Sequence, residues 1–309
     1  MKDNGDNRVR DAVKGHWVDT LLPDSARPFG QLARFDRPIG WWLLLLPCWW
    51  STALAAVASG DGSLNLKHIL LFVIGAVVMR GAGCTYNDIV DRDIDKAVVR
   101  TASRPIASGR VSISKAIIFV VFLSLIGLFV LLQFNAFAIF LGFGSLAFVA
   151  IYPFMKRITN WPQVALGFAF SWGALMGWAA HFGEISAAPL VLYLGAILWT
   201  VGYDTIYAHQ DREDDVLAGV KSTARLFGDN TKPWLFAFYS GATALFGLSF
   251  FLSDAGILSY AGLAIGAGHM VYQVAKLDIN NTDECLMMFR SNRDYGLILF
   301  AGLTLDVFF

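Results

Sequence analysis

Two short stretches rich in aspartate contain the residues of this chain best suited to chemistry. Residues 87–95 read Asn-Asp-Ile-Val-Asp-Arg-Asp-Ile-Asp, and residues 204–215 read Asp-Thr-Ile-Tyr-Ala-His-Gln-Asp-Arg-Glu-Asp-Asp. So many neighbouring carboxylates repel one another unless cations lie between them. Oxygen ligands suit Mg²⁺, which binds proteins through a few carboxylates together with substrate phosphates. The pattern predicts a site that binds a diphosphate through Mg²⁺.

The spacing within each stretch supports this interpretation. Both contain an Asp-x₃-Asp step, and residues four apart lie on one face of a helix. Acidic residues beside apolar helices are costly, which makes them functional candidates, although a solvated acidic loop is the plain alternative. The expected metal ligands are Asn87, Asp91, Asp95, Asp211 and Asp215.

Basic residues close to the acidic stretches could bind the diphosphate itself. Arg80 precedes Asn87 by about two helical turns, Arg104 follows the first stretch, and Lys221 follows the second. Charged hydrogen bonds from Arg and Lys suit phosphate oxygens. The alternative is that these charges only set the topology at a headgroup surface.

The elements that position these residues are long apolar segments. Of the 309 residues, 56% are hydrophobic and 16% are charged, whereas soluble domains carry about a quarter charged residues. Several apolar runs approach the roughly 18–20 residues that a membrane-spanning helix needs. We therefore expect an all-α polytopic membrane protein with nine transmembrane helices, at 39–59, 67–86, 115–133, 136–153, 163–181, 187–208, 233–252, 256–275 and a shorter one at 294–309.

The charge distribution predicts the orientation. Lys67 is the one residue among the 24 Lys and Arg that falls on the side of the short loops. By the positive-inside rule, the N-terminus and all charged loops, including both acidic stretches, should be cytoplasmic. We divide the chain into a cytoplasmic N-terminal segment, 1–33, and a transmembrane domain, 34–309.

The remaining signals concern the compartment. Three scattered cysteines, Cys48, Cys84 and Cys285, favour neither a disulfide framework nor a zinc site. The long polar leader argues against a cleaved secretory signal, and residues 1–36 mix acids with bases, unlike an organelle transit peptide. We expect an integral membrane protein of the bacterial inner membrane.

The motifs together resemble those of the UbiA superfamily of intramembrane prenyltransferases. They are Asn-Asp-x₂-Asp-x₃-Asp at 87–95, Asp-x₂-Tyr-Ala-x₂-Asp-x₃-Asp at 204–215, and the Lys-Ser-Thr that starts at Lys221. Further features are similar to the 4-hydroxybenzoate polyprenyltransferase branch, and the resemblance runs from about residue 30 to the C-terminus. These features are Arg34-Phe-Asp-Arg-Pro-Ile-Gly40, Met79-Arg-Gly-Ala-Gly-Cys84, Arg104-Pro105, Tyr152-Pro-Phe-Met-Lys-Arg157, Pro162-Gln163 and Tyr203-Asp-Thr205.

The resemblance implies nine transmembrane helices around a central cavity, with a cytoplasmic cap formed by the loops after helices 2 and 6. It implies Mg²⁺-dependent transfer of a polyprenyl group from an allylic diphosphate to the ring carbon ortho to the hydroxyl of 4-hydroxybenzoate, a step of ubiquinone biosynthesis. Asp91 and Asp211 then act at the metal–diphosphate, and Asp204 activates the acceptor. The implied partners are polyprenyl diphosphate, 4-hydroxybenzoate and membrane lipid, with no nucleic acid.

Two questions stay open at the level of sequence. Either Arg34 or Arg157 could pair with the acceptor carboxylate, and a topological role fits both equally well. A related prenyltransferase could use a naphthoate, homogentisate or haem as acceptor. An ion-coupled transporter is the rival of another class, and it predicts acidic residues in the middle of broken helices.

Overall fold

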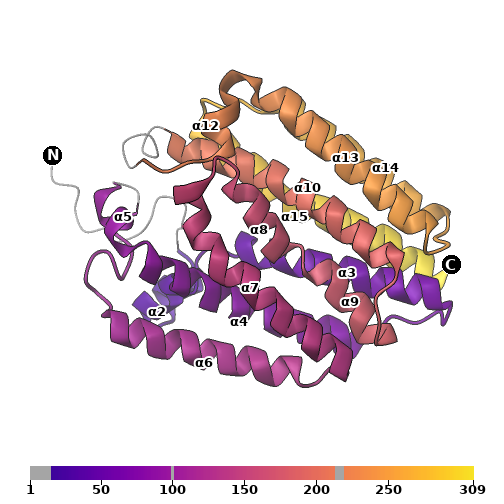
Figure 1. Cartoon of the computed structure of the whole chain (residues 1–309), viewed down its shortest axis with the longest axis horizontal. Helices are drawn as coiled ribbons and strands as arrows, with labels where there is room; N and C mark the ends of the chain where they lie inside the picture. The colour runs from indigo at the N-terminus through magenta and orange to yellow at the C-terminus, as the bar shows by residue number, and fades with distance from the viewer. Residues whose placement is uncertain (1–14, 99–100, 213–218) are drawn as a thin grey trace.

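The computed structural model describes residues 15–98, 101–212 and 219–309, and within them the secondary structure is helical, without a β-strand. The long helices run roughly alongside one another in one bundle (Figure 1). These are α3 (Ile39–Ser59), α4 (Leu66–Val90), α6 (Ile113–Leu131), α7 (Ala136–Ile158), α10 (Ala187–Ala208), α13 (Thr231–Phe251), α14 (Ile257–Lys276) and α15 (Thr282–Phe308).

Short helices accompany the long ones. α2, α5 and α12 lie toward the same end of the bundle, the left end in Figure 1. The short elements are α1 (Trp17–Thr20), α2 (Arg27–Leu32), α5 (Arg92–Ala97), α8 (Pro162–Phe170), α9 (Gly173–Phe182), η1 (His209–Asp211), α12 (Thr223–Phe227) and η2 (Gly228–Asn230).

In the part of the chain that the structure describes, six segments are long and apolar enough to cross a membrane, which fits an integral membrane protein. They are Ile39–Ser59, Leu66–Val90, Ile113–Leu131, Ala136–Ile158, Ala187–Asp211 and Thr223–Phe251. Each of the expected helices has a counterpart in the described chain, and the expected range 187–208 coincides with α10. The count of nine membrane spans stays a prediction.

The fifth expected helix, 163–181, is wrong in one respect, because it breaks into α8 and α9 at Ser171 and Trp172. α9 approaches α3 so closely that a Cβ on Gly177 would lie 2.4 Å from the backbone nitrogen of Thr52. The Ser171 hydroxyl lies 3.2 Å from that of Thr200 on α10. The break lets α9 pack on α3 while α8 packs between α7 and α10.

The last helix, expected at 294–309, begins twelve residues earlier, at Thr282. Its start is fixed by Asn281, whose side chain accepts hydrogen bonds from the backbone N–H groups of Asp283 and Glu284. The first half of this helix is rich in charged residues, so its hydropathy is too low to predict a membrane-spanning segment there. Arg290 is therefore helical and lines the main cavity, where a loop was expected.

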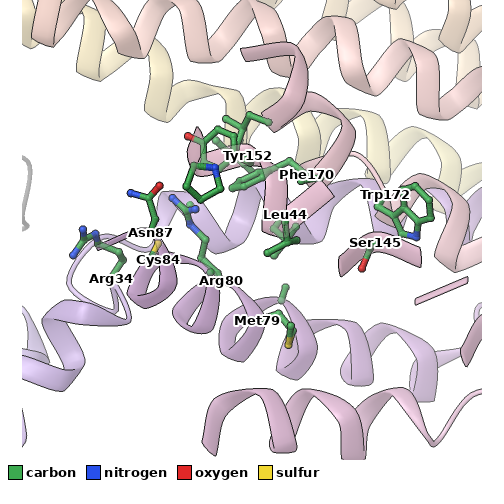
Figure 2. Close-up of a pocket in the computed structure, with 18 of the residues that line it drawn as sticks. Arg34, Leu44, Met79, Arg80, Cys84, Asn87, Ser145, Tyr152, Phe170 and Trp172 are labelled. Carbon is green, nitrogen blue, oxygen red and sulfur yellow. The ribbon is translucent and has the colours of Figure 1, made fainter. Parts of the chain in front are cut away.

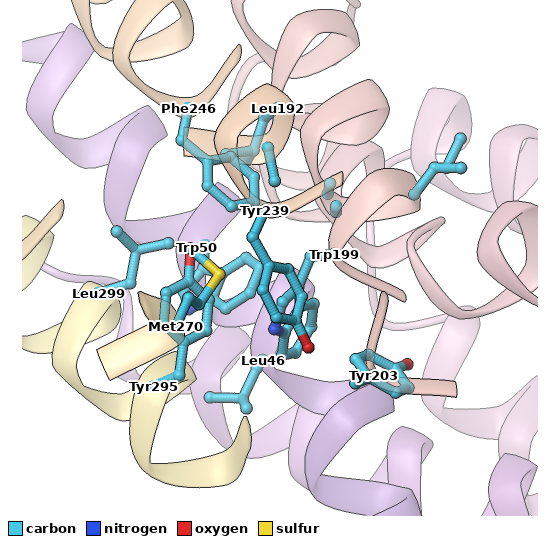
Figure 3. Close-up of a cluster of buried hydrophobic side chains, with 14 of the residues drawn as sticks. Leu46, Trp50, Leu192, Trp199, Tyr203, Tyr239, Phe246, Met270, Tyr295 and Leu299 are labelled. Carbon is cyan, nitrogen blue, oxygen red and sulfur yellow. The ribbon is translucent and has the colours of Figure 1, made fainter. Parts of the chain in front are cut away.

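The largest core is aromatic and lies among α3, α10, α13, α14 and α15 (Figure 3). Trp50, Trp199 and Tyr295 are fully buried there, and the Trp50 and Trp199 ring centroids lie 4.9 Å apart. The two indole N–H groups are paired: Trp199 Nε1 donates to Asn292 Oδ1 at 2.8 Å, and Trp50 Nε1 donates to the Gly296 carbonyl at 2.8 Å. This core closes one side of the bundle.

Candidate functional site

A cavity of about 780 Å³ occupies the other side of the bundle, among α3, α4, α6, α7, α8 and α10. Its lining on α4 runs from Leu71 to Asp88, which at 1.5 Å per residue corresponds to about 25 Å along the helix. The wall is mainly apolar, and the polar residues gather at the end where α5 lies (Figure 2). The cavity is therefore a long apolar groove with a charged end.

The two acidic stretches contribute to the same cavity, as predicted from the sequence. Asn87 and Asp95 reach it from α4 and α5, and Asp204 and Asp211 reach it from α10 and η1. Asp215 lies outside the described residues. The sequence places these groups on separate helices, and the packing of the bundle brings them to one charged end.

Asp88 was not selected from the sequence, yet it is central to the charged end. Its carboxylate is 1% exposed, and Oδ1 accepts hydrogen bonds from Arg34 Nη2 at 2.7 Å and from Arg104 Nη1 at 3.1 Å. Arg104 Nη1 also contacts Asp95 Oδ2 at 2.9 Å. Burial raises the pKa of Asp95, although the neighbouring Arg104 opposes that shift. Arg104 therefore bridges two buried carboxylates.

Arg34 adopts a left-handed backbone conformation, with φ of 58°. This conformation is costly for a residue with a side chain. Its Nη1 donates to the Gln31 carbonyl at 2.9 Å, while Nη2 contacts Asp88. The strained turn after α2 thus directs the guanidinium into the bundle, where it lines the cavity.

Asp91 is placed differently from the other predicted ligands. It is 1% exposed and lies behind the cavity wall, where its carboxylate contacts Lys156 and accepts from Arg157 Nη2 at 3.1 Å. Lys156 lines the cavity, and Arg157 lies at its outer side. Lys156 was not selected from the sequence, although it directly precedes Arg157 in the Tyr152–Arg157 motif.

Lys221 is positioned by the start of α8 and the end of α7. Its backbone N–H donates to the Lys156 carbonyl at 2.9 Å, and its Nζ donates to the Ile158 carbonyl at 3.1 Å. Two residues later, the Thr223 N–H donates to Gln163 Oε1 at 3.1 Å. These bonds explain the Pro162-Gln163 signal, because they tie the chain after the second acidic stretch to the same end of the cavity.

The polar groups form two layers. The outer layer contains Asn87 on α4 and Asp211 on η1. Arg80 and Asp204 each lie seven residues before these positions, which is two helical turns or about 10 Å deeper. Asp204 and Arg80 interact electrostatically, and Tyr152 of α7 lines the same depth of the cavity. A charged outer layer and a sparse inner layer could therefore receive different parts of a substrate.

The donor set fits a magnesium–diphosphate complex better than a free metal site. The described residues contain no ready cluster of three acidic, His or Cys ligands. Mg²⁺ usually keeps several waters and takes one or two carboxylates together with substrate phosphates. The oxygens of Asn87, Asp95 and Asp211, with Asp91 behind Lys156, are donors of the right type for that arrangement.

The broken helix argues against the transporter alternative. Broken transporter helices typically carry the ion- or substrate-binding groups at their break. The two halves here, α8 and α9, contain no acidic residue. The acids lie instead at the ends of continuous helices, among basic residues.

Comparison with known proteins decides the family. The model of the UbiA prenyltransferase family matches residues 44–293. The chain belongs to the UbiA prenyltransferase family. Its curated relatives include proteins named "4-hydroxybenzoate polyprenyltransferase, mitochondrial" from Arabidopsis thaliana and Homo sapiens. The first is 48% identical over 94% of this chain and 71% of the relative, and the second is 48% identical over 92% and 76%.

Solved structures of UbiA homologues share the fold. The apo structure of a homologue from Aeropyrum pernix K1 is 27% identical with a TM-score of 0.71, covering 86% of this chain and 97% of that one. A homologue from Archaeoglobus fulgidus, bound to GPP and Mg²⁺, is 18% identical with a TM-score of 0.64, covering 91% and 99%. The second likeness supports the UbiA fold alone.

Proposed function

We propose that this chain transfers a polyprenyl group from an allylic polyprenyl diphosphate to the ring carbon ortho to the hydroxyl of 4-hydroxybenzoate, a step of ubiquinone biosynthesis. The observation that carries the proposal is the identity of 48% with relatives of that name over more than nine-tenths of the chain. The cavity supports it independently, because a charged end continues into a long apolar groove suited to an isoprenoid tail.

The outer layer would bind the diphosphate. Mg²⁺ held by Asn87, Asp91, Asp95, Asp211 and Asp215 would neutralise charge that develops on the leaving group. Arg104 and Lys221 would add charged hydrogen bonds to its oxygens. The allylic C–O bond breaks with its electron pair going to the diphosphate, and the carbocation that remains lies at the mouth of the apolar groove.

The inner layer would position the acceptor. Asp204 would orient the phenol hydroxyl and increase the electron density of the ring, whose ortho carbon forms the new C–C bond and then loses a proton. The apolar wall excludes water that would otherwise quench the carbocation. Arg80 and either Arg34 or Arg157 are the cations we propose for the remaining anionic oxygens of the two substrates.

We also propose the topology on the basis of charge. The end that carries α2, α5 and α12 would face the cytoplasm of a bacterium, with residues 1–33 on that side, residues 34–309 as the transmembrane domain, and the loops after α4 and α10 forming a cap. The named relatives are mitochondrial, and in that membrane the same end would face the matrix. Membrane lipid would surround the apolar outer faces of α6 and α7.

A product assay tests the function directly. Purified protein in proteoliposomes receives 4-hydroxybenzoate, geranyl diphosphate and Mg²⁺, and mass spectrometry follows the prenylated product. We expect product with Mg²⁺, none with EDTA, and recovery when Mg²⁺ is restored. If product forms only with a naphthoate or homogentisate, that compound replaces 4-hydroxybenzoate as the acceptor. If geranyl diphosphate stays intact with every acceptor, the protein does not transfer prenyl groups.

A further inference from the structure

Arg80 is held differently from three other arginines near the charged end. Arg34, Arg104 and Arg157 each contact a carboxylate directly. Arg80 Nε, in contrast, is buried without a hydrogen-bond acceptor among the described residues. Its guanidinium lies over the Phe170 ring, with Cζ 4.9 Å from the ring centroid. The Arg80 guanidinium is therefore held by close packing and by the Phe170 ring, and, in the described part of the chain, not by contact with a carboxylate.

Gly40 makes a second contact to the guanidinium, close to its Nε and Nη2 atoms. A Cβ built on Gly40 would lie 2.6 Å from Arg80 Nε, 3.1 Å from Nη2 and 3.2 Å from Cζ. The guanidinium thus lies against the bare backbone at the start of α3. Gly40 has an ordinary helical conformation, so the reason for glycine here is space for Arg80.

Phe170 reaches this position because of the helix break. It is the last residue of α8, directly before the interruption at Ser171 and Trp172. Both Phe170 and Arg80 line the cavity, and Arg80 extends from α4 toward the side on which Tyr152 and Phe170 lie (Figure 2). A cation beside the carboxyl end of a helix is also favoured by the helix dipole.

We propose that Gly40 and Phe170 are positioning residues that together form a clamp on the Arg80 guanidinium, Phe170 with its ring and Gly40 with its bare backbone, so that the Nη donors stay directed at an anionic oxygen group of the substrate. The clamp leaves the donors uncommitted, because a π face and a Cα–H surface accept no strong hydrogen bond. The inference rests on the proposed function and adds two residues that act through Arg80. The anionic group is either the diphosphate or the acceptor carboxylate.

Gly40→Ala tests the clamp with little cost to the fold, because the clashing atoms belong to the end of a flexible side chain. We expect the substitution to lower kcat/KM about 10- to 100-fold, the range for loss of one charged hydrogen bond. Gly268→Ala is the matched control, since Gly268 is helical, lies outside the cavity lining and has no atom within 4 Å of the added Cβ. It should match the wild type.

A double-mutant cycle with Arg80→Lys separates positioning from a structural role. Lysine lacks the Nε that Gly40→Ala would displace, so Gly40→Ala should cost less than about twofold in that background. Phe170→Leu, which keeps the α3 contact, should cost about three- to tenfold in the wild-type background and again little beside Arg80→Lys. Equal losses in both backgrounds, or normal activity of both Gly40→Ala and Phe170→Leu, would overturn the clamp.

Binding measurements identify the anion and keep the test independent of turnover. An unreactive allylic thiolodiphosphate and 4-hydroxybenzoate are titrated separately into folded protein. Weaker thiolodiphosphate binding by Gly40→Ala assigns the clamp to the diphosphate, and weaker hydroxybenzoate binding, with no change for neutral 4-hydroxybenzonitrile, assigns it to the carboxylate. Unchanged affinity for both ligands contradicts the clamp. Failure of the proposed function would show differently, as wild-type protein that forms no prenylated hydroxybenzoate.

Discussion

The aromatic core and the charged end of the cavity both bury polar groups, but they satisfy them in different ways. In the core the two buried tryptophan N–H groups have neutral partners, Trp199 with Asn292 and Trp50 with the Gly296 carbonyl. At the charged end the partners are ionised and shared, because Asp88 binds two arginines and Arg104 binds two carboxylates.

The difference has a physical consequence. Neutral one-to-one pairs have a single best arrangement, so they stiffen the wall behind the cavity. Shared ionic contacts have alternatives of similar energy, and a charged ligand can replace one partner without leaving a buried charge uncompensated. The core should therefore determine stability, whereas the charged end should determine affinity and rate.

The largest expected effect is at the charged end. Asp91→Ala or Asp211→Ala should lower prenyl transfer by about 10³-fold or more, because each removes charge stabilisation at the leaving group, while the protein stays folded in the membrane. Asp93→Asn is the control, since Asp93 lies in the same stretch as Asp91 but its side chain is 75% exposed. Normal turnover in either alanine variant would reject the metal–diphosphate assignment.

The next effect tests the core. Phe246→Ala should destabilise the protein by about 3–5 kcal/mol, because it leaves a void beside Trp50, whose ring centroid is 5.5 Å away. Phe251→Ala on the same helix should change stability little, since Phe251 is 69% exposed and Phe246 is fully buried. Thermal unfolding in detergent measures both. Equal destabilisation by the two variants would remove the distinction between the regions.

The smallest expected effect tests whether Arg104, which contacts two carboxylates, acts on substrate binding or on stability. Arg104→Lys keeps the charge, but the shorter lysine cannot place its nitrogen where Arg104 Nη1 contacts both Asp88 and Asp95, so KM for the allylic diphosphate should rise about tenfold. The melting temperature should stay close to that of the wild type. Arg92→Lys, at a half-exposed pair with Asp93, is the control. A large loss of stability with unchanged KM would assign Arg104 to the fold instead.

Much of the architecture could be predicted from the sequence because hydrophobic length and charge placement are local properties. The helix ends at 39, 59, 187 and 208 agree with α3 and α10. The break between α8 and α9 was not predicted, because it accompanies a contact between helices that are distant in the sequence, the close packing of Gly177 on α3. The early start of α15 was missed because a charged helix inside a membrane protein lacks the hydropathy signal.

The sequence by itself determined the class of site: carboxylates at Asp-x₃-Asp spacing, basic residues nearby, and apolar helices to carry them. Tertiary structure decided which charges share a partner. It made Asp88 the junction of Arg34 and Arg104, covered Asp91 with Lys156, and placed both Gly40 and Phe170 against the Arg80 guanidinium. The reason is physical: spacing along one helix sets a face, but contacts between helices depend on how closely each pair can approach.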